Sequence, residues 1–147
     1  MRILKLILKS IISFIVFGFF VWVFIFNWPF VFKKRIVGHL ATVERVGTEI
    51  IVDNRTGSIP PQAFSFSIAI QDLKTGEIHM ASSEDRKWAA AQKGNCVVAA
   101  YYPYPPWKIN KGTTDYNARL IQNFQTCDNV PSELSFWGKI KFFFLWV

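Results

Sequence analysis

The sequence has few of the residues on which catalytic and metal sites usually depend. It contains only two histidines, His39 and His79, and neither stands at ligand spacing from another histidine, a cysteine or a pair of carboxylates. The adjacent acids Glu84 and Asp85 point apart in the first turn of a predicted helix, where the helix dipole accounts for them. The patterns GxGxxG, GxxxxGKS/T and GxSxG are absent. We therefore expect no catalytic residue, no metal site and no cofactor.

Acidic residues are also scarce, with 10 Asp and Glu against 17 Lys and Arg and a formal net charge of +7. The excess flanks apolar segments at the two ends, because residues 36–132 carry nine basic and nine acidic side chains. A nucleic-acid-binding protein concentrates basic residues in one patch, where they release counterions. The central part of the chain has no such concentration, so we expect no nucleic-acid partner.

One long run of the sequence has no charge at all. Residues 10–32 read SIISFIVFGFFVWVFIFNWPFVF, between Lys9 and the basic residues 33–35. As a helix the run would extend roughly 34 Å, enough to cross a hydrocarbon core of about 30 Å. A cleaved signal peptide would have a shorter apolar core followed by small residues, and a buried core helix would have a polar face. We predict that residues 1–35 are an N-terminal membrane anchor with an uncleaved span at 10–32.

Three basic residues precede the span and three follow it, so the positive-inside rule does not decide its orientation. The two cysteines indicate on which side of the membrane the domain lies. Cys96 and Cys127 make the number that one structural disulfide requires, and disulfides persist in oxidising compartments. Two unrelated buried thiols are the alternative. We predict a bonded pair worth about 3 to 4 kcal/mol by the chain-entropy model. The domain would then be periplasmic, on the inner membrane of a bacterium.

Between its apolar ends the sequence alternates in the manner of β-strands. The clearest case is AFSFSIAIQD at residues 63–72, where every second side chain is a Phe or an Ile. Further strands are predicted at residues 38–46 with a continuation at 48–52, and at 77–81, 95–102 and 116–126. A short helix is predicted at residues 86–93, RKWAAAQK, after an N-capping serine and before Gly94.

Three strands, a helix and two further strands form the element order of an OB-fold barrel. We therefore predict a mainly β domain at residues 36–127, an OB-like five-stranded barrel with one short helix between strands three and four. An SH3-like barrel and an irregular five-stranded sheet are the alternatives. Antiparallel fourth and fifth strands would bring Cys96 and Cys127 together at the open end of that pair.

The residues after the barrel, 128–147, comprise a linker and the aromatic segment SFWGKIKFFFLWV at 135–147. As a helix this segment would extend only about 20 Å, too short to span a bilayer. Lys139 and Lys141 interrupt its apolar residues, which is typical of amphipathic helices that lie in the membrane interface. We predict that position, and the alternative is a tail that packs on a partner or on the anchor.

The stretch YYPYPPW at residues 101–107 is the main candidate for a binding surface. In OB folds the loops after the first and fourth strands flank the ligand face. The candidate binding residues in or next to those loops are Tyr101, Tyr102, Tyr104, Trp107, Lys108 and Arg55. Three roles compete for the stretch. The tyrosines could fill the barrel and the prolines end the strand, the rings could bind a partner, or they could contact the membrane near the start of strand one.

The stretches SSEDRKWAA, KGNC, YYPYPPW and YNARL resemble those of small bacterial proteins that carry one membrane-anchored β-domain. The resemblance implies such a domain and no particular chemistry. Together with the residues above, it predicts a non-enzymatic, membrane-tethered barrel that binds or scaffolds a protein partner or an envelope glycan beside the lipid bilayer. The alternative is an envelope enzyme, or an enzyme subunit, that acts on a glycan or lipid. Single-stranded nucleic-acid binding by the barrel face is a third hypothesis.

Overall fold

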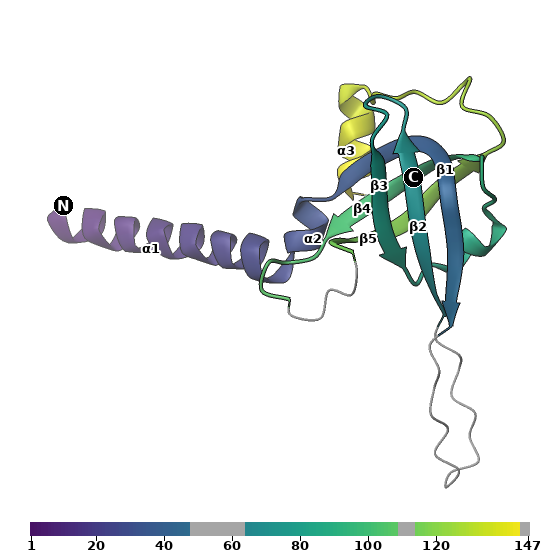
Figure 1. Ribbon diagram of the computed structural model, residues 1–147. Coiled ribbons are helices and arrows are strands. Elements are labelled where there is room, and N and C mark those ends of the chain that lie inside the picture. The colour runs from purple at the N-terminus through teal and green to yellow at the C-terminus, as the bar shows by residue number, and fades with distance from the viewer. Residues whose placement is uncertain (48–63, 109–113, 145–147) are drawn as a thin grey trace, which may run out of the picture.

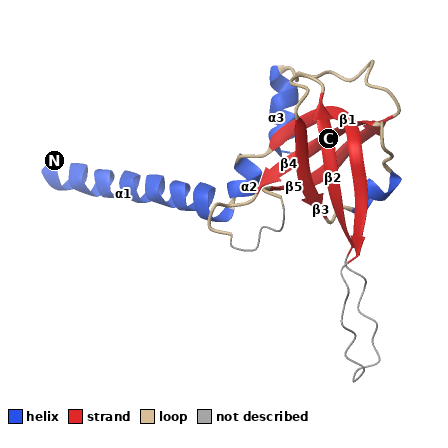
Figure 2. Ribbon diagram, in the orientation of Figure 1, coloured by secondary structure: helices blue, strands red, loops and turns tan. Residues whose placement is uncertain are grey.

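A computed structural model of the chain describes residues 1–47, 64–108 and 114–144. It consists of an apolar helical segment at the amino end, a barrel of β-strands, and a short C-terminal helix beside the barrel (Figure 1). Figure 2 shows that the strands form the compact part of the molecule and that the long helix projects away from them.

The apolar segment begins as α1 (Arg2–Val21) and continues through one π-helical turn, η1 (Trp22–Phe26). The combined helix Arg2–Phe26 has 25 residues and a mean hydropathy of 2.4, and almost none of it is buried. By length and composition it could cross a membrane. It starts earlier than the predicted span at residues 10–32 and also ends earlier.

Asn27 ends the long helix. Its backbone φ of −120° leaves the helical range, and its backbone N–H and side-chain amide both donate to the carbonyl oxygen of Trp22, at 3.0 and 3.1 Å. Pro29 occupies the first turn of the one-turn helix α2 (Trp28–Val31), a position that needs no backbone donor. The first strand begins at Lys34, so the helical segment joins the barrel without a flexible linker.

Five strands close into a barrel. They are β1 (Lys34–Gly47), β2 (Phe64–Asp72), β3 (Ile78–Ser83), β4 (Cys96–Pro103) and β5 (Tyr116–Phe124), hydrogen-bonded in the closed order β1-β2-β3-β5-β4. β3 and β5 are parallel, and the other neighbouring pairs are antiparallel. The predicted mainly β, five-stranded barrel is confirmed. The predicted continuation at residues 48–52 lies outside the described residues.

The barrel core follows from the alternation in β2. Phe66, Ile68 and Ile70 are buried there, in one cluster with Leu40 of β1 and Val97 of β4. Gly38 of β1 lies opposite the end of β2, and a Cβ at this position would be 1.8 Å from the carbonyl oxygen of Gln71. The two strands can therefore approach this closely only at a glycine.

The prediction of a short helix at residues 86–93, between the third and fourth strands, is wrong: no α-helix forms there. Residues Arg86–Ala90 form a five-residue 3-10 turn, η2, and the α-helix that accompanies the barrel is C-terminal, α3 (Phe136–Phe144). Trp88 explains the difference, because its ring is fully buried and its Nε1 donates to the carbonyl oxygen of Ala118 at 3.3 Å. Asp85 is fixed as well, since its Oδ2 accepts from the backbone N–H of Leu120 at 3.1 Å. These tertiary contacts outweigh the helix propensity of the sequence.

The predicted disulfide is present at the end of the β4–β5 pair. Cys96 and Cys127 are bonded, and their Cα atoms are 5.2 Å apart. Beyond Cys127 the linker packs Val130 against a second apolar cluster that includes Val37. The linker thus returns toward the start of β1.

Two basic residues hold the linker to the barrel. Arg35 donates to the carbonyl oxygens of Pro131 and Ser132, at 3.1 and 3.2 Å, and Lys74 forms an ion pair with Glu133. The linker then leads into α3, which lies on the side of the barrel from which α1 departs (Figure 1).

Candidate functional site

The candidate stretch at residues 101–107 lies where the helical segment enters the barrel. β1 and β4 are antiparallel neighbours, and Lys34 at the start of β1 is paired with Tyr101 near the end of β4. The loop that follows β4 is therefore next to α2. The six candidate residues differ in what they do there.

Tyr101 belongs to the barrel core. Its side chain is 1% exposed, its hydroxyl donates to the carbonyl oxygen of His79 at 3.0 Å, and its ring lies 5.9 Å from that of Tyr116. Burial raises the pKa of the Tyr101 hydroxyl above its ordinary value. Of the three roles proposed for the stretch, Tyr101 has the structural one and does not form part of an exposed surface.

Tyr102 lies on the other face of β4 and is half-buried. Burial raises the pKa of its hydroxyl, and the guanidinium of Arg119, which is hydrogen-bonded to it, partly opposes that effect. The side chain thus forms part of the outer wall of the β4–β5 pair, with its polar end held by the neighbouring strand.

Tyr104 ties the loop to the barrel and presents one face of its ring. Its hydroxyl lies 3.2 Å from Oγ of Ser82 and accepts from Nδ2 of Asn117 at 3.4 Å. Its backbone N–H donates to the carbonyl oxygen of Asp115 at 3.0 Å. The ammonium of Lys108 stands 4.2 Å from the ring centroid, a cation–π distance. Tyr104 and Lys108 therefore form one ordered unit.

Trp107 connects the loop to the helical segment. Half of its side chain is exposed, and its ring meets that of Trp28 edge to face, with centroids 5.8 Å apart. Trp28 also packs against Phe32 at 4.4 Å. Tryptophan residues with one apolar and one wet side are typical of membrane interfaces. Arg55, the remaining candidate, lies outside the described residues.

Sequence reasoning missed the role of Lys33 in this region. Its side chain is 9% exposed, and its ammonium lies 3.6 Å from the ring centroid of Phe30, 5.0 Å from Phe143 and 5.7 Å from Phe142. It also donates a hydrogen bond to the carbonyl oxygen of Phe143. Burial lowers the pKa of Lys33. The alternative in which the tail packs on the anchor allowed for such a contact, but no pattern in the sequence pointed to Lys33 as the residue that makes it.

The helix held by Lys33 turns apolar side chains outward. Phe136 and Trp137 are 71% and 70% exposed, and Phe144 is 51% exposed. With 3.6 residues per turn, these three residues and Ile140 lie on one face of the helix, and Lys139 and Lys141 lie on the two borders of that face. α3 runs crosswise to α1 (Figure 1). Trp107, Phe136, Trp137 and Phe144 are thus among the exposed aromatic residues on this side of the barrel.

In the part of the chain that the structure describes, no group of three His, Cys, Asp or Glu side chains is close enough together to hold a metal ion. His79 Nε2 lies 3.7 Å from Oδ2 of Asp72, and His39 Nδ1 lies 4.0 Å from Sγ of Cys127. The chain matches no protein-family model, no curated protein and no solved structure. The functional interpretation therefore depends on the geometry of the chain itself.

Proposed function

We propose that this chain is a non-enzymatic, membrane-tethered barrel that binds or scaffolds a partner at the membrane surface. One observation carries the proposal: three segments far apart in the sequence converge at the base of the apolar helix. The contact between Trp28 and Trp107 joins α2 to the loop after β4, and the contact between Lys33 and Phe143 joins the same region to α3. A barrel that was only attached to a membrane would need a linker and none of these contacts.

Within this proposal the barrel is of the OB type. The closed order β1-β2-β3-β5-β4 and the parallel pairing of β3 with β5 favour it over an SH3-like barrel. The loop after the fourth strand borders the ligand face of OB folds. Here that loop supplies Tyr104, Trp107 and Lys108.

The proposed location is the inner membrane of a bacterium, with the barrel in the periplasm. The disulfide supports an oxidising compartment, and α1 with η1 is the single span. With α1 along the membrane normal, the crosswise α3 lies in the plane of the membrane. Its aromatic face then enters the interface, and Lys139 and Lys141 extend toward the lipid headgroups.

The proposed partner is a protein or an envelope glycan that meets the loop beside the bilayer. Tyrosine and tryptophan are favoured anchors of binding surfaces, because they bury a large area with few rotatable bonds. Pro103, Pro105 and Pro106 restrict the loop, so less conformational entropy is lost on binding. The ordered unit of Tyr104 and Lys108 would provide a ring and a cation in fixed positions.

Photo-crosslinking in native membranes tests the proposal. Benzoylphenylalanine replaces Trp107 in the full-length protein, and the matched control places it at Gln122, an exposed residue of β5. We expect lipid adducts and a protein or glycan adduct from position 107 only. Adding Tyr104→Ala should remove the partner adduct and keep the lipid adducts. Equal adducts from both positions, or release of the protein by an alkaline carbonate wash, would contradict the proposal.

A further inference from the structure

A pocket lies at the end of the barrel opposite the helical segment. The pocket has a volume of about 480 Å³, and its lining residues are Ala90, Gln92, Asn95, Asn123, Phe124 and Gln125. They come from η2, the turn before β4 and the end of β5. The arrow of β4 in Figure 1 points toward α1, so the start of β4 and the pocket beside it face away from the helical segment. The pocket is therefore separate from the loop after β4.

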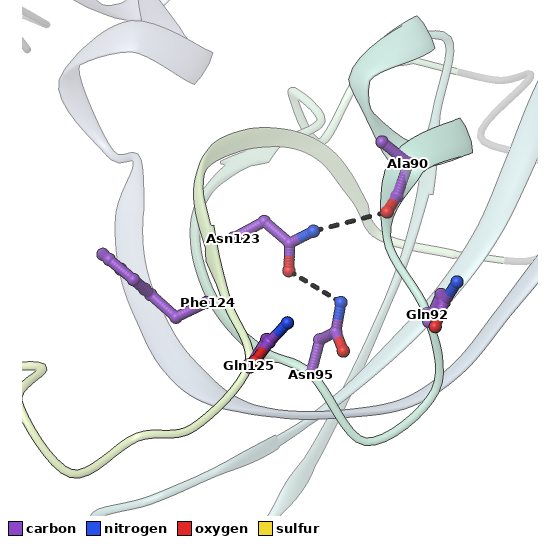
Figure 3. Close-up of a pocket in the computed structure, with 6 residues that line it drawn as sticks. All are labelled: Ala90, Gln92, Asn95, Asn123, Phe124 and Gln125. Atoms are coloured by element: carbon purple, nitrogen blue, oxygen red, sulfur yellow. Dashed lines mark hydrogen bonds between the residues drawn. The ribbon is translucent and has the colours of Figure 1, made fainter.

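Two of its amides are held in place. Figure 3 shows Asn95 and Asn123 turned toward each other, and Asn95 Nδ2 donates to Asn123 Oδ1 at 3.0 Å. Asn123 Nδ2 in turn donates to the carbonyl oxygen of Ala90 at 3.4 Å. This chain of hydrogen bonds links the turn before β4 to β5 and η2. It also leaves the Oδ1 of Asn95 without a hydrogen-bond partner in the described part of the chain.

The other two amides have no structural partner of this kind. Among the described residues, no side-chain hydrogen bond involves Gln92 or Gln125, and both residues are exposed. Phe124 is 39% exposed, but its ring points to the other side of β5, away from the amides (Figure 3). The pocket thus offers two fixed and two free amides.

The disulfide bears directly on this geometry. Cys96 follows Asn95 in the chain, and Cys127 lies two residues beyond Gln125. The bond between the cysteines therefore ties the two segments that carry these amides. A site whose walls are tied together loses less entropy when a ligand binds.

The chemistry of the lining is uniform. Each carboxamide has both donors and acceptors, which is the complement of a ligand rich in hydroxyl groups. No charged side chain lines the pocket, so a phosphate or a carboxylate would lose its hydration without gaining a counter-charge. The volume falls in the range of small-molecule sites, about 300 to 1,000 Å³.

From this geometry we infer that the pocket binds a segment of a neutral oligosaccharide. The inference goes beyond the proposed function, because it assigns a ligand class to a different end of the barrel. It relies on the proposed function only for the compartment in which such a glycan would be met. A single-stranded oligonucleotide could also use the amides, but its phosphates would need cations, and none of the described lining residues is charged.

Titration of the full-length protein in nanodiscs tests the inference. The probes are chitotetraose, which carries N-acetyl groups, and cellotetraose, which does not, and binding is measured by isothermal titration calorimetry. The main variant is Gln92→Ala/Gln125→Ala, since neither side chain has a structural hydrogen bond within the described residues. Gln122→Ala is the matched control, because it removes an exposed glutamine of β5 outside the pocket.

We expect saturable binding of at least one probe, weakened at least about tenfold in the double variant and unchanged in the control. Thermal unfolding should be the same in all three proteins. The absence of saturable binding at millimolar probe, or equal binding by the double variant, would overturn the inference. A deoxythymidine oligonucleotide that binds with the same dependence on Gln92 and Gln125 would also overturn it. None of these outcomes changes the crosslinking expected at Trp107, so the two proposals can fail separately.

Discussion

Lys33 donates a hydrogen bond to the main-chain carbonyl oxygen of Phe143, a residue 110 positions farther along the chain. The donor is a charged group enclosed by phenylalanine rings, at distances typical of cation–π contacts. The contact holds the end of α3 at the base of the apolar helix. It is therefore the most direct target for separating the C-terminal helix from the rest of the molecule.

Replacing this lysine should loosen α3 without unfolding the barrel. Lys33→Met keeps the length of the side chain and removes its charge, which should cost about 1 to 2 kcal/mol of local stability. We expect amide hydrogen exchange in residues 136–144 to become roughly tenfold faster, while exchange in β4 is unchanged. The control is Lys141→Met, which removes an exposed lysine of α3. Equal exchange in both variants would show that Lys33 does not hold the helix.

The burial of Tyr101 predicts a dependence of stability on alkaline pH. Its pKa is raised in the folded protein, so near pH 10 the hydroxyl ionises in the unfolded chain while it stays neutral in the barrel. The resulting stabilisation is complete below about pH 10 and is lost as the pH rises above that value. Tyr101→Phe removes this titration and the hydrogen bond to His79, which should cost about 1 kcal/mol at neutral pH.

The measurement is thermal unfolding of both proteins between about pH 8 and pH 11. We expect the melting temperature of the variant to start lower and to fall less steeply. Parallel curves for the two proteins would show that Tyr101 is not the group responsible.

The disulfide should supply a large share of the stability of the barrel. Cys96 and Cys127 are 31 residues apart in the chain, and a closed loop of that size is worth about 3 to 4 kcal/mol in the chain-entropy model. We expect Cys96→Ala/Cys127→Ala to unfold at a markedly lower denaturant concentration and to be insensitive to dithiothreitol. The wild type should fall to the same midpoint when it is reduced. If reduction leaves the wild-type midpoint unchanged, the bond contributes little to stability.

Gly38 should tolerate no side chain. Gly38→Ala would place a methyl group 1.8 Å from the carbonyl oxygen of Gln71, where only movement of the backbone could relieve the clash. We expect a loss of at least about 2 kcal/mol in the free energy of unfolding, measured by chemical denaturation. Gly47→Ala is the control, since no atom lies within 4 Å of a Cβ built there. Similar losses in the two variants would mean that the register between β1 and β2 differs from the one described.

The sequence predicted the parts of the fold that depend on neighbouring residues. Alternation alone located β2, because Phe66, Ile68 and Ile70 must share the buried face of a pleated strand. The disulfide was predicted because the chain has two cysteines and antiparallel fourth and fifth strands bring them together. The structure confirms the bond and its place at the end of that strand pair. Periodicity also gave the positions of the five strands along the chain, because alternation is a local property of the sequence.

The errors arose where distant residues decide local structure. The sequence around Trp88 has the composition of an α-helix, but the burial of its ring beside β5 allows only a 3-10 turn. Lys33 and Arg35 flank the predicted span, and they also bind carbonyl oxygens of the C-terminal segment, which no local pattern indicates. Tyr101 and Tyr102 are adjacent tyrosines, and only the register of β4 shows which of them enters the core. The amide pocket was not predicted, because its residues come together only when the barrel closes.

The direct junction between the helical segment and β1 limits where the barrel can go. A flexible linker of 20 residues has a root-mean-square end-to-end distance of roughly 25 Å, so an attached domain could move by about that distance in any direction. Here β1 starts at Lys34 and reaches His39, paired with Cys96, after only about 17 Å of strand. The pocket lined by Asn95 and Asn123 is therefore held at a nearly constant distance from the end of the helical segment. In a membrane the pocket would move by lateral diffusion within a thin layer at one distance from the bilayer. It would bind only partners whose binding groups lie in that layer.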